Sequence, residues 1–451
     1  MAELTKNAII SLCTEGYSSS GDAVARFEGQ TVFVKGALAG ENVAARILKV
    51  TKNVAFAKVE SVIDASPHRV VPSCPLFGRC GGCDFLHMDY AEELTAKRQR
   101  VEDALRRIGG LDVAVPPVVG AERIARYRNK AIYAVGGTRG EPVTGFYRER
   151  SHDILPVDAC AIQADYSERA ARAVRLWIER RGVEPYDEMT GKGLVRRVYN
   201  RFGFGAGQGM TVLVTGAGKL PDVPFLLDAL REACPETVSV VRNVNTTRGN
   251  TVLAGKFVTL YGEDAIEDEL CGLKFRLSPR SFYQVNRDQA ERLYARVIAL
   301  AGLTAQDFAL DLYCGVGTIT LALAQSAGRV IGAEVVPEAV ENARENAKLN
   351  GIANAEFILA DAAEVAAKLA KSGERPAVVV VDPPRKGLAP EVTESVISIA
   401  PERIVYVSCD PATLARDLKL FAEGGYRTVS AEPFDMFPRC AHIETVALLV
   451  R

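Results

Sequence analysis

The C-terminal part of the chain alternates between short apolar runs and amphipathic stretches of helical length. The runs occupy residues 308–313, 329–334, 355–361, 377–382, 403–408 and 441–450. Continuous runs rich in β-branched residues, joined by helices, predict a parallel sheet that is covered on both faces. Ligands of such sheets bind beyond the carboxyl ends of the strands, so polar side chains at those ends are the first candidates for a site.

The first 65 residues show a second pattern, made of short strand-like segments at regular spacing. These segments occupy residues 22–27, 31–34, 42–48 and 53–59, and glycine-containing turns separate them. Short, evenly spaced strands of this kind predict a small closed β-barrel. Ser66-Pro67 and Val71-Pro72 then interrupt the pattern, which indicates a domain boundary.

From about residue 66 to 265 the sequence is mixed and carries basic clusters with tyrosines among them. The basic residues are Arg123, Arg126, Arg128, Lys130, Arg148, Arg150, Arg196, Arg197 and Arg201, and the tyrosines are Tyr127, Tyr147 and Tyr199. Cations beside aromatic rings suit phosphate contacts and base stacking in single-stranded RNA. The solvated face of a strand has a similar composition, so both interpretations of this region stay open.

The overall charge does not point to a polyanionic partner, because 55 basic residues balance 56 acidic ones. Any nucleic-acid surface must therefore be local. No segment approaches the roughly 20 apolar residues that span a bilayer, and the N-terminus lacks a basic region followed by an apolar one. We expect a soluble, cytoplasmic monomer without membrane contact. Ten scattered cysteines are too few for a disulfide scaffold and favour reduced thiols or a metal.

Three cysteines lie within ten residues, at Cys74, Cys80 and Cys83, and Cys160 is the candidate for a fourth ligand. This C-x5-C-x2-C spacing is hard to explain as core. Glycines at 81 and 82 allow backbone N–H groups to approach the sulfurs, as they do in thiolate metal sites. The spacing predicts a metal, and it is compatible with zinc or with an iron–sulfur cluster.

Cys409 follows the apolar run 403–408 and precedes a helix-like pattern, so it stands at a strand-to-helix turn. Asp410 is a favourable N-cap and Pro411 a favourable first helical residue. We expect the positive end of that helix to favour the Cys409 thiolate, which makes this residue a candidate nucleophile. The alternative is a small buried hydrophobe without chemistry.

The strand ends narrow the choice of cofactor. The segment Asp311 to Thr318 turns from strand to helix with only two glycines and no lysine, so it fits neither a dinucleotide fingerprint nor a nucleoside triphosphate site. Glu334 closes the second run, where an acidic residue meets ribose hydroxyls, and Asp361 closes the third, in reach of an adenine amino group. A nucleoside without phosphates fits, as in S-adenosylmethionine.

Two further acidic residues belong to the same predicted sheet edge. Asp382 begins the segment Asp382-Pro383-Pro384-Arg385, which is similar to the D-P-P-Y loop of amino-methyltransferases except that Arg385 replaces the base-stacking aromatic. That departure argues against N-methylation. Glu444 enters an apolar strand, where an unpaired charge is costly. It is either a salt-bridged residue at the core edge or a tuned base.

Taken together, the motifs resemble the RNA uracil C5-methyltransferase family, whose members make 5-methyluridine in ribosomal and transfer RNA. The resemblance rests on these segments: the C-x5-C-x2-C set with Cys160, residues 278–286 (Ser-Pro-Arg-Ser-Phe-Tyr-Gln-Val-Asn), residues 311–317, residues 382–385, Ser408-Cys409-Asp410-Pro411 and His442-Ile443-Glu444. Two positions depart from the family pattern, because Thr318 replaces a frequent Asn and Cys440 a frequent Thr.

The resemblance implies a multidomain fold. Residues 1–65 would form an RNA-binding TRAM or OB-like barrel, residues 66–265 a central α+β region with an iron–sulfur cluster and RNA contacts, and residues 266–451 a Rossmann-like α/β methyltransferase domain. It also implies site residues by role: a [4Fe-4S] cluster on Cys74, Cys80, Cys83 and Cys160; S-adenosylmethionine contacts from Gln284, Tyr313, Glu334, Asp361 and Asp382; Cys409 as nucleophile; and Glu444 as base.

The chemistry expected from this resemblance begins with addition of Cys409 to C6 of uracil, since C5 alone is too weak a nucleophile. Methyl transfer to C5, proton removal by Glu444 and elimination follow. The accessory barrel and the cluster favour 23S ribosomal RNA over transfer RNA as the substrate. A cytosine C5-methyltransferase is disfavoured because no Pro-Cys dipeptide with a catalytic context occurs. A noncatalytic RNA-binding metal scaffold is a further alternative.

Overall fold

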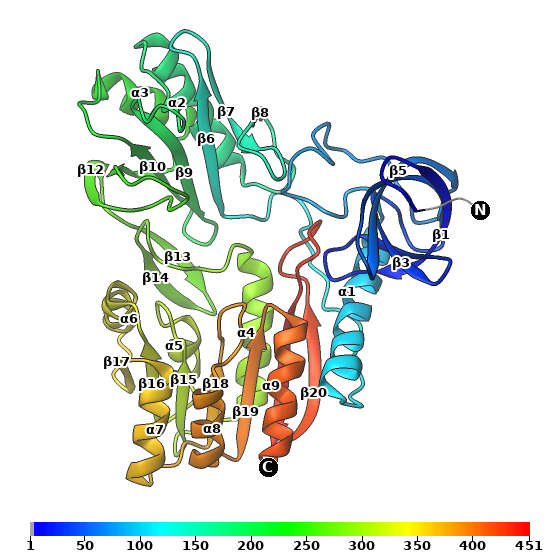
Figure 1. Cartoon of the computed structure of the whole chain (residues 1–451). Coiled ribbons are helices and arrows are strands. Elements are labelled where there is room, and N and C mark those ends of the chain that lie inside the picture. The colour runs from blue at the N-terminus through cyan, green and yellow to red at the C-terminus, as the bar shows by residue number, and fades with distance from the viewer. Residues whose placement is uncertain (1–3) are drawn as a thin grey trace.

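The computed structural model describes residues 4–451 and shows three parts joined side by side (Figure 1). An N-terminal barrel and a central sheet with two helices lie next to a C-terminal sheet that is covered by helices on both faces. Within the described residues, no helix is both long and apolar enough to cross a membrane.

The N-terminal part is a closed five-stranded barrel, as the spacing of the segments predicted. Its strands are β1 (Ile9–Tyr17), β2 (Ala23–Phe27), β3 (Gln30–Lys35), β4 (Asn42–Val50) and β5 (Val54–Asp64), in the order β1-β2-β3-β5-β4. The sequence pattern missed β1. Its inward positions include Thr14 and Gly16 beside Ile10 and Leu12, so the apolar alternation is weak.

The central part is an α+β layer, as expected. Its sheet has the order β12-β11-β10-β9-β6-β7-β8. The strands are β6 (Lys130–Gly137), β7 (Pro142–Tyr147), β8 (Ile154–Pro156), β9 (Val195–Gly203), β10 (Gln208–Thr215), β11 (Thr237–Val244) and β12 (Lys256–Gly262). Helices α2 (Asp165–Arg180) and α3 (Val223–Ala233) pack on this sheet through a core that contains Val174 and Trp177.

The C-terminal sheet has the order β17-β16-β15-β18-β19-β21-β20. Its strands are β15 (Phe308–Leu312), β16 (Arg329–Glu334), β17 (Ala355–Leu359), β18 (Val378–Val381), β19 (Arg403–Ser408), β20 (Arg427–Phe434) and β21 (Glu444–Val450). The first five are parallel, and β21 runs antiparallel between β19 and β20. β20 was not expected, because polar and apolar residues alternate along this edge strand instead of forming a continuous apolar run.

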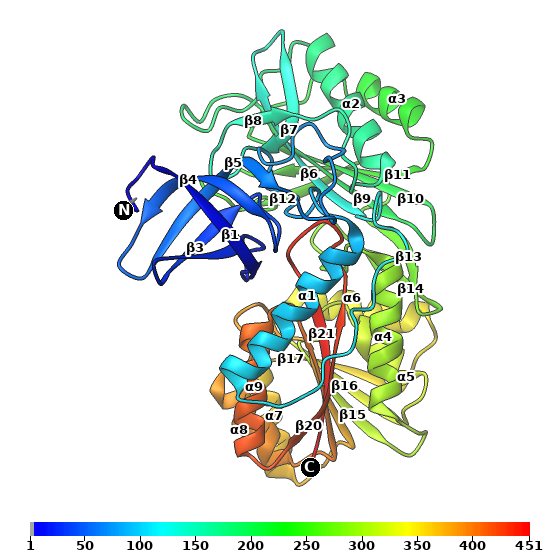
Figure 2. The same ribbon diagram turned by 90° about the vertical axis from the view of Figure 1, so that its right-hand side faces the viewer.

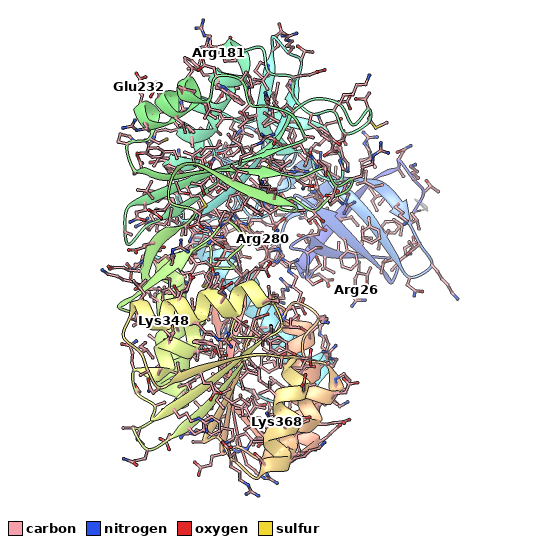
Figure 3. The ribbon with its side chains drawn as sticks, turned by 90° about the vertical axis from the view of Figure 1, so that its left-hand side faces the viewer. Arg26, Arg181, Glu232, Arg280, Lys348 and Lys368 are labelled. Atoms are coloured by element: carbon pink, nitrogen blue, oxygen red, sulfur yellow. The ribbon has the colours of Figure 1, made fainter. Side chains whose placement is uncertain are left out.

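Six helices join these strands or precede them: α4 (Arg287–Ala301), α5 (Thr318–Ala324), α6 (Pro337–Leu349), α7 (Ala362–Ser372), α8 (Pro390–Ile399) and α9 (Pro411–Glu423). A separate hairpin, β13 (Ile266–Leu270) and β14 (Leu273–Leu277), leads from the central part into α4. Between this hairpin and α4, Arg280 lies where the central and C-terminal parts meet (Figure 3).

Helix α1 (Tyr90–Ala104) packs away from the region in which the sequence places it. Together with the π-helical turn at Leu105–Gly109, it contacts α9 and β20, and it lies across the C-terminal part in Figure 2. Val101, Val115 and Val118 are buried in the same core as the C-terminal sheet. The domain boundary predicted at residue 265 therefore divides residues that share one core. The sequence could not show this, because an amphipathic pattern indicates which face a helix buries but not the element that the face packs against.

Candidate active site

The loop after β15 forms the first wall of the site. It continues into α5 through Gly317, whose φ is +85° and whose missing Cβ would lie 2.9 Å from the Phe357 ring. The Thr320 hydroxyl donates to Asp311 Oδ2 at 2.6 Å, whereas the buried Asp311 Oδ1 has no partner among the described residues. Burial raises the Asp311 pKa to about 7. A buried, half-satisfied carboxyl at a strand end is suited to a polar or cationic ligand.

Two carboxylates expected to bind the cofactor follow the neighbouring strands. Glu334 closes β16 and accepts hydrogen bonds from the backbone N–H groups of Gly315 at 3.1 Å and of Val335 and Val336 at 2.9 Å each. Asp361 caps α7 through Ala363 N at 2.9 Å. Each carboxylate is thus fixed at the carboxyl end of its strand.

Tyr313 and Gln284 complete the residues expected to bind the cofactor. Tyr313 has a φ of +70°, and burial together with the Asp361 carboxylate raises its pKa to about 12. Gln284 is buried in the loop before α4, where the Asn129 side chain donates to its carbonyl oxygen at 2.9 Å. Asn286 caps α4 in the same loop, which fixes the position of the loop beside the sheet.

Cys409 stands directly after β19, and Asp410 caps α9 as predicted. The Asp410 carboxylate accepts from Ala412 N at 2.9 Å and from Thr413 N at 3.0 Å. The expectation of a favoured thiolate is wrong for the protein without ligands. Burial, and then the acidic Glu444 and Asp382, raise the Cys409 pKa to about 12. The carboxylate of Asp410 already uses the free donors of the helix, so little of its positive potential reaches the thiol.

Glu444 lies on the strand adjacent to the one that ends just before Cys409. It begins β21, and its neighbour Thr445 pairs with Ser408, the residue before Cys409. Burial and the nearby Asp382 raise the Glu444 pKa well above its usual range, although Arg385 opposes this. No residue between 4 and 451 forms a salt bridge with Glu444, which leaves the alternative of a tuned base.

Asp382 and Arg385 lie on the loop between β18 and α8, and both act electrostatically on Cys409 and Glu444. Asp382 follows β18, and burial raises its pKa to about 7. Arg385 lies within 3.2 Å of His442, measured from Nη2 to Nε2. The strand ends thus gather the Cys409 thiol, the buried Glu444 carboxyl, the partly buried Asp382 carboxyl and the exposed Arg385 guanidinium, a set suited to nucleophilic addition and proton transfer.

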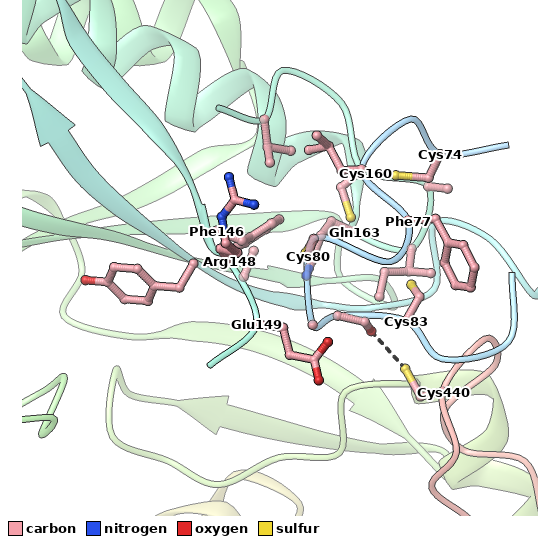
Figure 4. Close-up of a pocket in the computed structure, with 18 of the residues that line it drawn as sticks. Cys74, Phe77, Cys80, Cys83, Phe146, Arg148, Glu149, Cys160, Gln163 and Cys440 are labelled. Atoms are coloured by element: carbon pink, nitrogen blue, oxygen red, sulfur yellow. Dashed lines mark hydrogen bonds between the residues drawn. The ribbon is translucent and has the colours of Figure 1, made fainter. Parts of the chain in front are cut away.

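The four expected ligand cysteines line a single cavity of about 790 Å³ between the segment 74–86, the central sheet and the loop before β21. Figure 4 shows the thiols of Cys74, Cys80, Cys83 and Cys160 around this space. Backbone N–H groups of Ile162 and Gln163 approach the Cys160 sulfur, and that of Gly82 approaches the Cys80 sulfur. Within residues 4–451, no group of three His, Cys, Asp or Glu side chains lies close enough together to hold a single metal ion.

A fifth thiol, Cys440, lies at the same cavity and was noted in the sequence only as a departure from a pattern. Its sulfur lies 3.1 Å from the Gly82 carbonyl oxygen (Figure 4). Asp84 N donates to the Arg439 carbonyl at 2.8 Å, and the Asp84 carboxylate accepts from Ala441 N at 2.8 Å. The cysteine-bearing loop is therefore joined to the segment that leads into Glu444.

A buried ion network holds this segment from the other side. Lys97 of α1 donates to Glu93 and to Asp435 at 2.7 Å each, and to the Phe437 carbonyl at 3.1 Å. Burial lowers the Lys97 pKa, but the two carboxylates outweigh it and raise the pKa above its usual range. Tyr90 donates to the second Asp435 oxygen at 2.7 Å. Lys97 and Glu93 are one helical turn apart, but the contacts with Asp435 and Phe437 join residues far apart in the sequence, and no local signal could have revealed them.

Comparison with sequence families gives two matches. Residues 260–451 match the family described as tRNA (Uracil-5-)-methyltransferase, and residues 12–59 match the TRAM domain. An uncharacterized RNA methyltransferase of Halalkalibacterium halodurans is 42% identical over 449 residues, which cover 99% of this chain and 98% of that protein. One of Caldanaerobacter subterraneus subsp. tengcongensis is 44% identical over 431 residues, covering 96% and 95% respectively.

Among solved structures, the chain is similar to the Pyrococcus abyssi tRNA (uracil-54, C5)-methyltransferase in complex with S-adenosyl-L-homocysteine. The two share a TM-score of 0.78 and 28% identity, and the match covers 98% of this chain and 100% of that one. The similarity extends over all three parts of the fold.

Proposed function

Since the chain belongs to the RNA uracil C5-methyltransferase family, we propose that it methylates uridine through a covalent adduct in which Cys409 is the nucleophile and Glu444 the base. The observation that supports this most strongly is that Cys409, directly after β19, lies near Glu444, at the start of the adjacent strand β21. The Glu444 carboxyl is buried and forms no salt bridge within residues 4–451. S-adenosylmethionine supplies the methyl group.

The first step is attack of the Cys409 sulfur on C6 of the uracil. The bond to C6 makes C5 part of an enolate, which is nucleophilic enough to take a methyl group. In the protein without ligands the thiol holds its proton, because burial, and then Glu444 and Asp382, raise its pKa to about 12. A positive charge beside Asp382 would weaken that effect, so we expect thiol ionisation to follow cofactor binding.

The last step returns the enzyme to its starting state. Glu444 takes the proton from C5 of the methylated adduct, and the electron pair left behind expels the Cys409 sulfur from C6. Burial suits Glu444 to this role, since a carboxylate with a raised pKa is a stronger base than one in water. Arg385 lies near both groups and is placed to stabilise negative charge on the uracil.

We assign the cofactor contacts to the five residues at the strand ends and in the loop before α4, namely Gln284, Tyr313, Glu334, Asp361 and Asp382. Acidic side chains after successive parallel strands suit ribose hydroxyls, an adenine amino group and a cationic ligand. The fixed positions of Glu334 and Asp361, each held by backbone donors, support this assignment.

We further propose that Cys74, Cys80, Cys83 and Cys160 hold a [4Fe-4S] cluster. Their thiols share one cavity, and backbone donors approach two of the sulfurs, as in thiolate metal sites. A single zinc ion draws its ligands to about 2.3 Å, whereas a cluster needs a wider space between the sulfurs. Protein prepared without oxygen should contain about four irons per chain and no stoichiometric zinc. Zinc without iron would overturn this assignment.

Two substrate classes remain candidates. The cluster-bearing cavity and the TRAM barrel favour ribosomal RNA, whereas the similarity to an archaeal enzyme named for tRNA uracil-54 favours transfer RNA. Mapping 5-methyluridine in both RNA classes, in cells with and without the protein, decides between them.

The covalent mechanism is tested with Cys409→Ala. We expect this variant to bind S-adenosylmethionine normally and to lose methyl transfer by at least about 10³-fold, because no other group can add to C6. Cys13→Ala, which removes an exposed thiol on β1, is the matched control and should retain activity. Methyl transfer at the normal rate by Cys409→Ala would exclude the mechanism.

A further inference from the structure

Of the nine basic residues that the sequence singles out in the central part, five form ion pairs within the protein. Arg126 pairs with Glu168, Arg123 with Asp288, and Arg197 approaches Glu188. Lys130 of β6 and Arg201 of β9 form no ion pair with an acid anywhere in residues 4–451, and neither do Arg128 and Arg196. Among these four cations, Lys130 and Arg201 stand on adjacent strands.

These two cations also face each other. Lys130 and Arg201 are direct partners in the antiparallel pairing of β6 with β9, where like charges are destabilising. Arg201 is buried, and burial together with Arg201 and Arg128 lowers the Lys130 pKa to about 8. Such a pair is unfavourable in the protein alone and becomes favourable when an anion lies between the two side chains.

A cavity of about 330 Å³ lies at this pair. Besides Lys130 and Arg201, its wall includes Tyr199, Ser281 and Phe282. Arg201 is held in a fixed direction, because it donates to the Tyr199 hydroxyl at 2.7 Å and to the Ser281 carbonyl at 2.6 Å. Phe282 is 65% exposed, which is unusual for so large an apolar side chain and leaves a ring face free beside the cations.

We propose that this cavity binds a phosphodiester group of the RNA strand close to the target uridine. The proposal rests on the proposed function and adds to it a defined contact. Ser281 and Phe282 belong to the same loop as Gln284, so the cavity adjoins the cofactor end of the sheet. Lys130 also lines the larger cavity, to which His442, two residues before Glu444, contributes. The RNA strand would pass Lys130 before its target uridine reaches Cys409.

A phosphate explains the chemistry of the cavity better than a neutral ligand. The lysine ammonium is a compact positive charge, and the planar arginine guanidinium can donate two parallel hydrogen bonds, so both suit phosphate oxygens. An exposed ring at the rim accepts a neighbouring base by stacking. The carboxylate of the methionine moiety of S-adenosylmethionine is the other anion available at this end of the sheet, and the experiment separates the two.

The first test uses Lys130→Gln, with Lys219→Gln, an exposed lysine of the same part, as the matched control. Binding of a uridine-containing RNA oligonucleotide that the wild-type protein methylates is measured over a range of salt concentrations. We expect Lys130→Gln to bind about tenfold more weakly at low salt, and its slope of log affinity against log salt to fall by about 0.7. The control should match the wild type.

Cofactor affinity is measured on the same variants. Unchanged affinity for S-adenosylmethionine in Lys130→Gln supports the phosphate assignment, whereas weaker cofactor binding with an unchanged salt slope would assign the cavity to the cofactor carboxylate and overturn the proposal. The melting temperature of Lys130→Gln should equal or exceed that of the wild type, because the variant removes a like-charge pair. A failure of the proposed function is recognised separately, since the wild type would then methylate no RNA.

The second test locates the phosphate. Single phosphodiesters of the oligonucleotide are replaced in turn by uncharged methylphosphonates. One position near the target uridine should weaken binding to the wild type by about tenfold and have little effect on Lys130→Gln, because both changes remove the same contact. Additive losses at every position would show that Lys130 contacts no single phosphate and would refute the site.

Discussion

Cys409 and Glu444 occupy positions that the fold holds at an energetic cost. The Glu444 carboxyl is buried and forms no salt bridge within residues 4–451, and the pKa of the Cys409 thiol is raised first by burial and then by Glu444 and Asp382. Groups perturbed in this way are typical of sites whose ligands bring a compensating charge. The two residues proposed to perform the chemistry are thus suited to the occupied state of the site and not to the empty one.

Glu444→Gln should separate catalysis from stability. Because the folded pKa of Glu444 lies above its unfolded value, ionisation destabilises the fold progressively as pH rises above about 4.3. The variant lacks this penalty, so its free energy of unfolding should exceed that of the wild type by about 1–3 kcal/mol at pH 8 and converge with it near pH 4. Thermal unfolding across this pH range checks the result.

The same variant should trap the reaction after methyl transfer. With no base to remove the C5 proton, a covalent complex between Cys409 and methylated RNA should accumulate and be visible on a denaturing gel. Glu432→Gln, at a carboxyl of the neighbouring β20 that pairs with Arg296, is the control and should release product. Free turnover by Glu444→Gln would exclude Glu444 as the base.

Cofactor binding should depend on pH near neutrality. Asp382 has a pKa of about 7, and a cationic sulfonium favours its ionised form. Affinity for S-adenosylmethionine should therefore fall about tenfold between pH 8 and pH 6. Calorimetric titration checks this, and the uncharged sulfide of S-adenosylhomocysteine should show a smaller decrease. A flat profile for S-adenosylmethionine would contradict the role given to Asp382.

At this scale the sequence was informative wherever the signal is local. Cys409, Asp410 and the cysteine spacing lie in short motifs, so they were found, and their environments follow from the fold. The direction of the Cys409 pKa was predicted wrongly because it depends first on burial of the thiol and then on Glu444 and Asp382, and all three arise only when β18, β19 and β21 are paired.

At the scale of elements, the segment between β20 and β21 connects the cavity lined by the four cysteines to Glu444. Residues 437–441 are bonded to the cysteine loop through Asp84 and to α1 through Lys97. Glu444 follows directly, so its position depends on both contacts. Sequence patterns gave β21 but neither α1's docking nor this segment, because each is defined by contacts between residues more than 300 positions apart.

Asp84→Ala should loosen this segment. Without the acceptor for Ala441 N, Glu444 is less precisely placed, and kcat should fall about tenfold or more while affinity for S-adenosylmethionine stays unchanged. Asp84→Asn keeps an acceptor oxygen and should recover most of the activity. Iron content is measured in parallel, because Asp84 follows Cys83. Normal turnover by Asp84→Ala, with the normal iron content, would show that the contact does not position the base.

At the scale of the molecule, residues 266–451 alone do not contain the whole core that surrounds the C-terminal sheet. Val101, Leu105, Val115 and Val118 are buried in its core. At about 1.5–3 kcal/mol for each buried side chain, they contribute about 6 kcal/mol or more, which is comparable with the whole stability of a domain. Evenly spaced strands and apolar runs revealed the barrel and the C-terminal sheet, and only the family resemblance implied the α+β central part. The joint core crosses the boundary that the sequence indicated.

A fragment of residues 266–451 should therefore be insoluble or lack a cooperative unfolding transition. Fusion of residues 86–118 to the fragment should restore one, because it returns α1 and its apolar contacts to α9 and β20. Differential scanning calorimetry of both proteins checks the prediction. A sharp transition in the shorter fragment would show that α1 is dispensable for this core.

The position of β21 has a consequence for how the enzyme is made. This strand follows the other six strands of its sheet in the chain, yet it lies between two of them. During translation, a chain that has reached β20 carries Cys409 and the cofactor residues but not Glu444, and the edges of β19 and β20 are still open. Open edges are templates for aggregation. A stalled ribosome would therefore release a protein with the proposed nucleophile, without the proposed base, and with two unpaired strand edges, which makes it a target for cellular proteolysis.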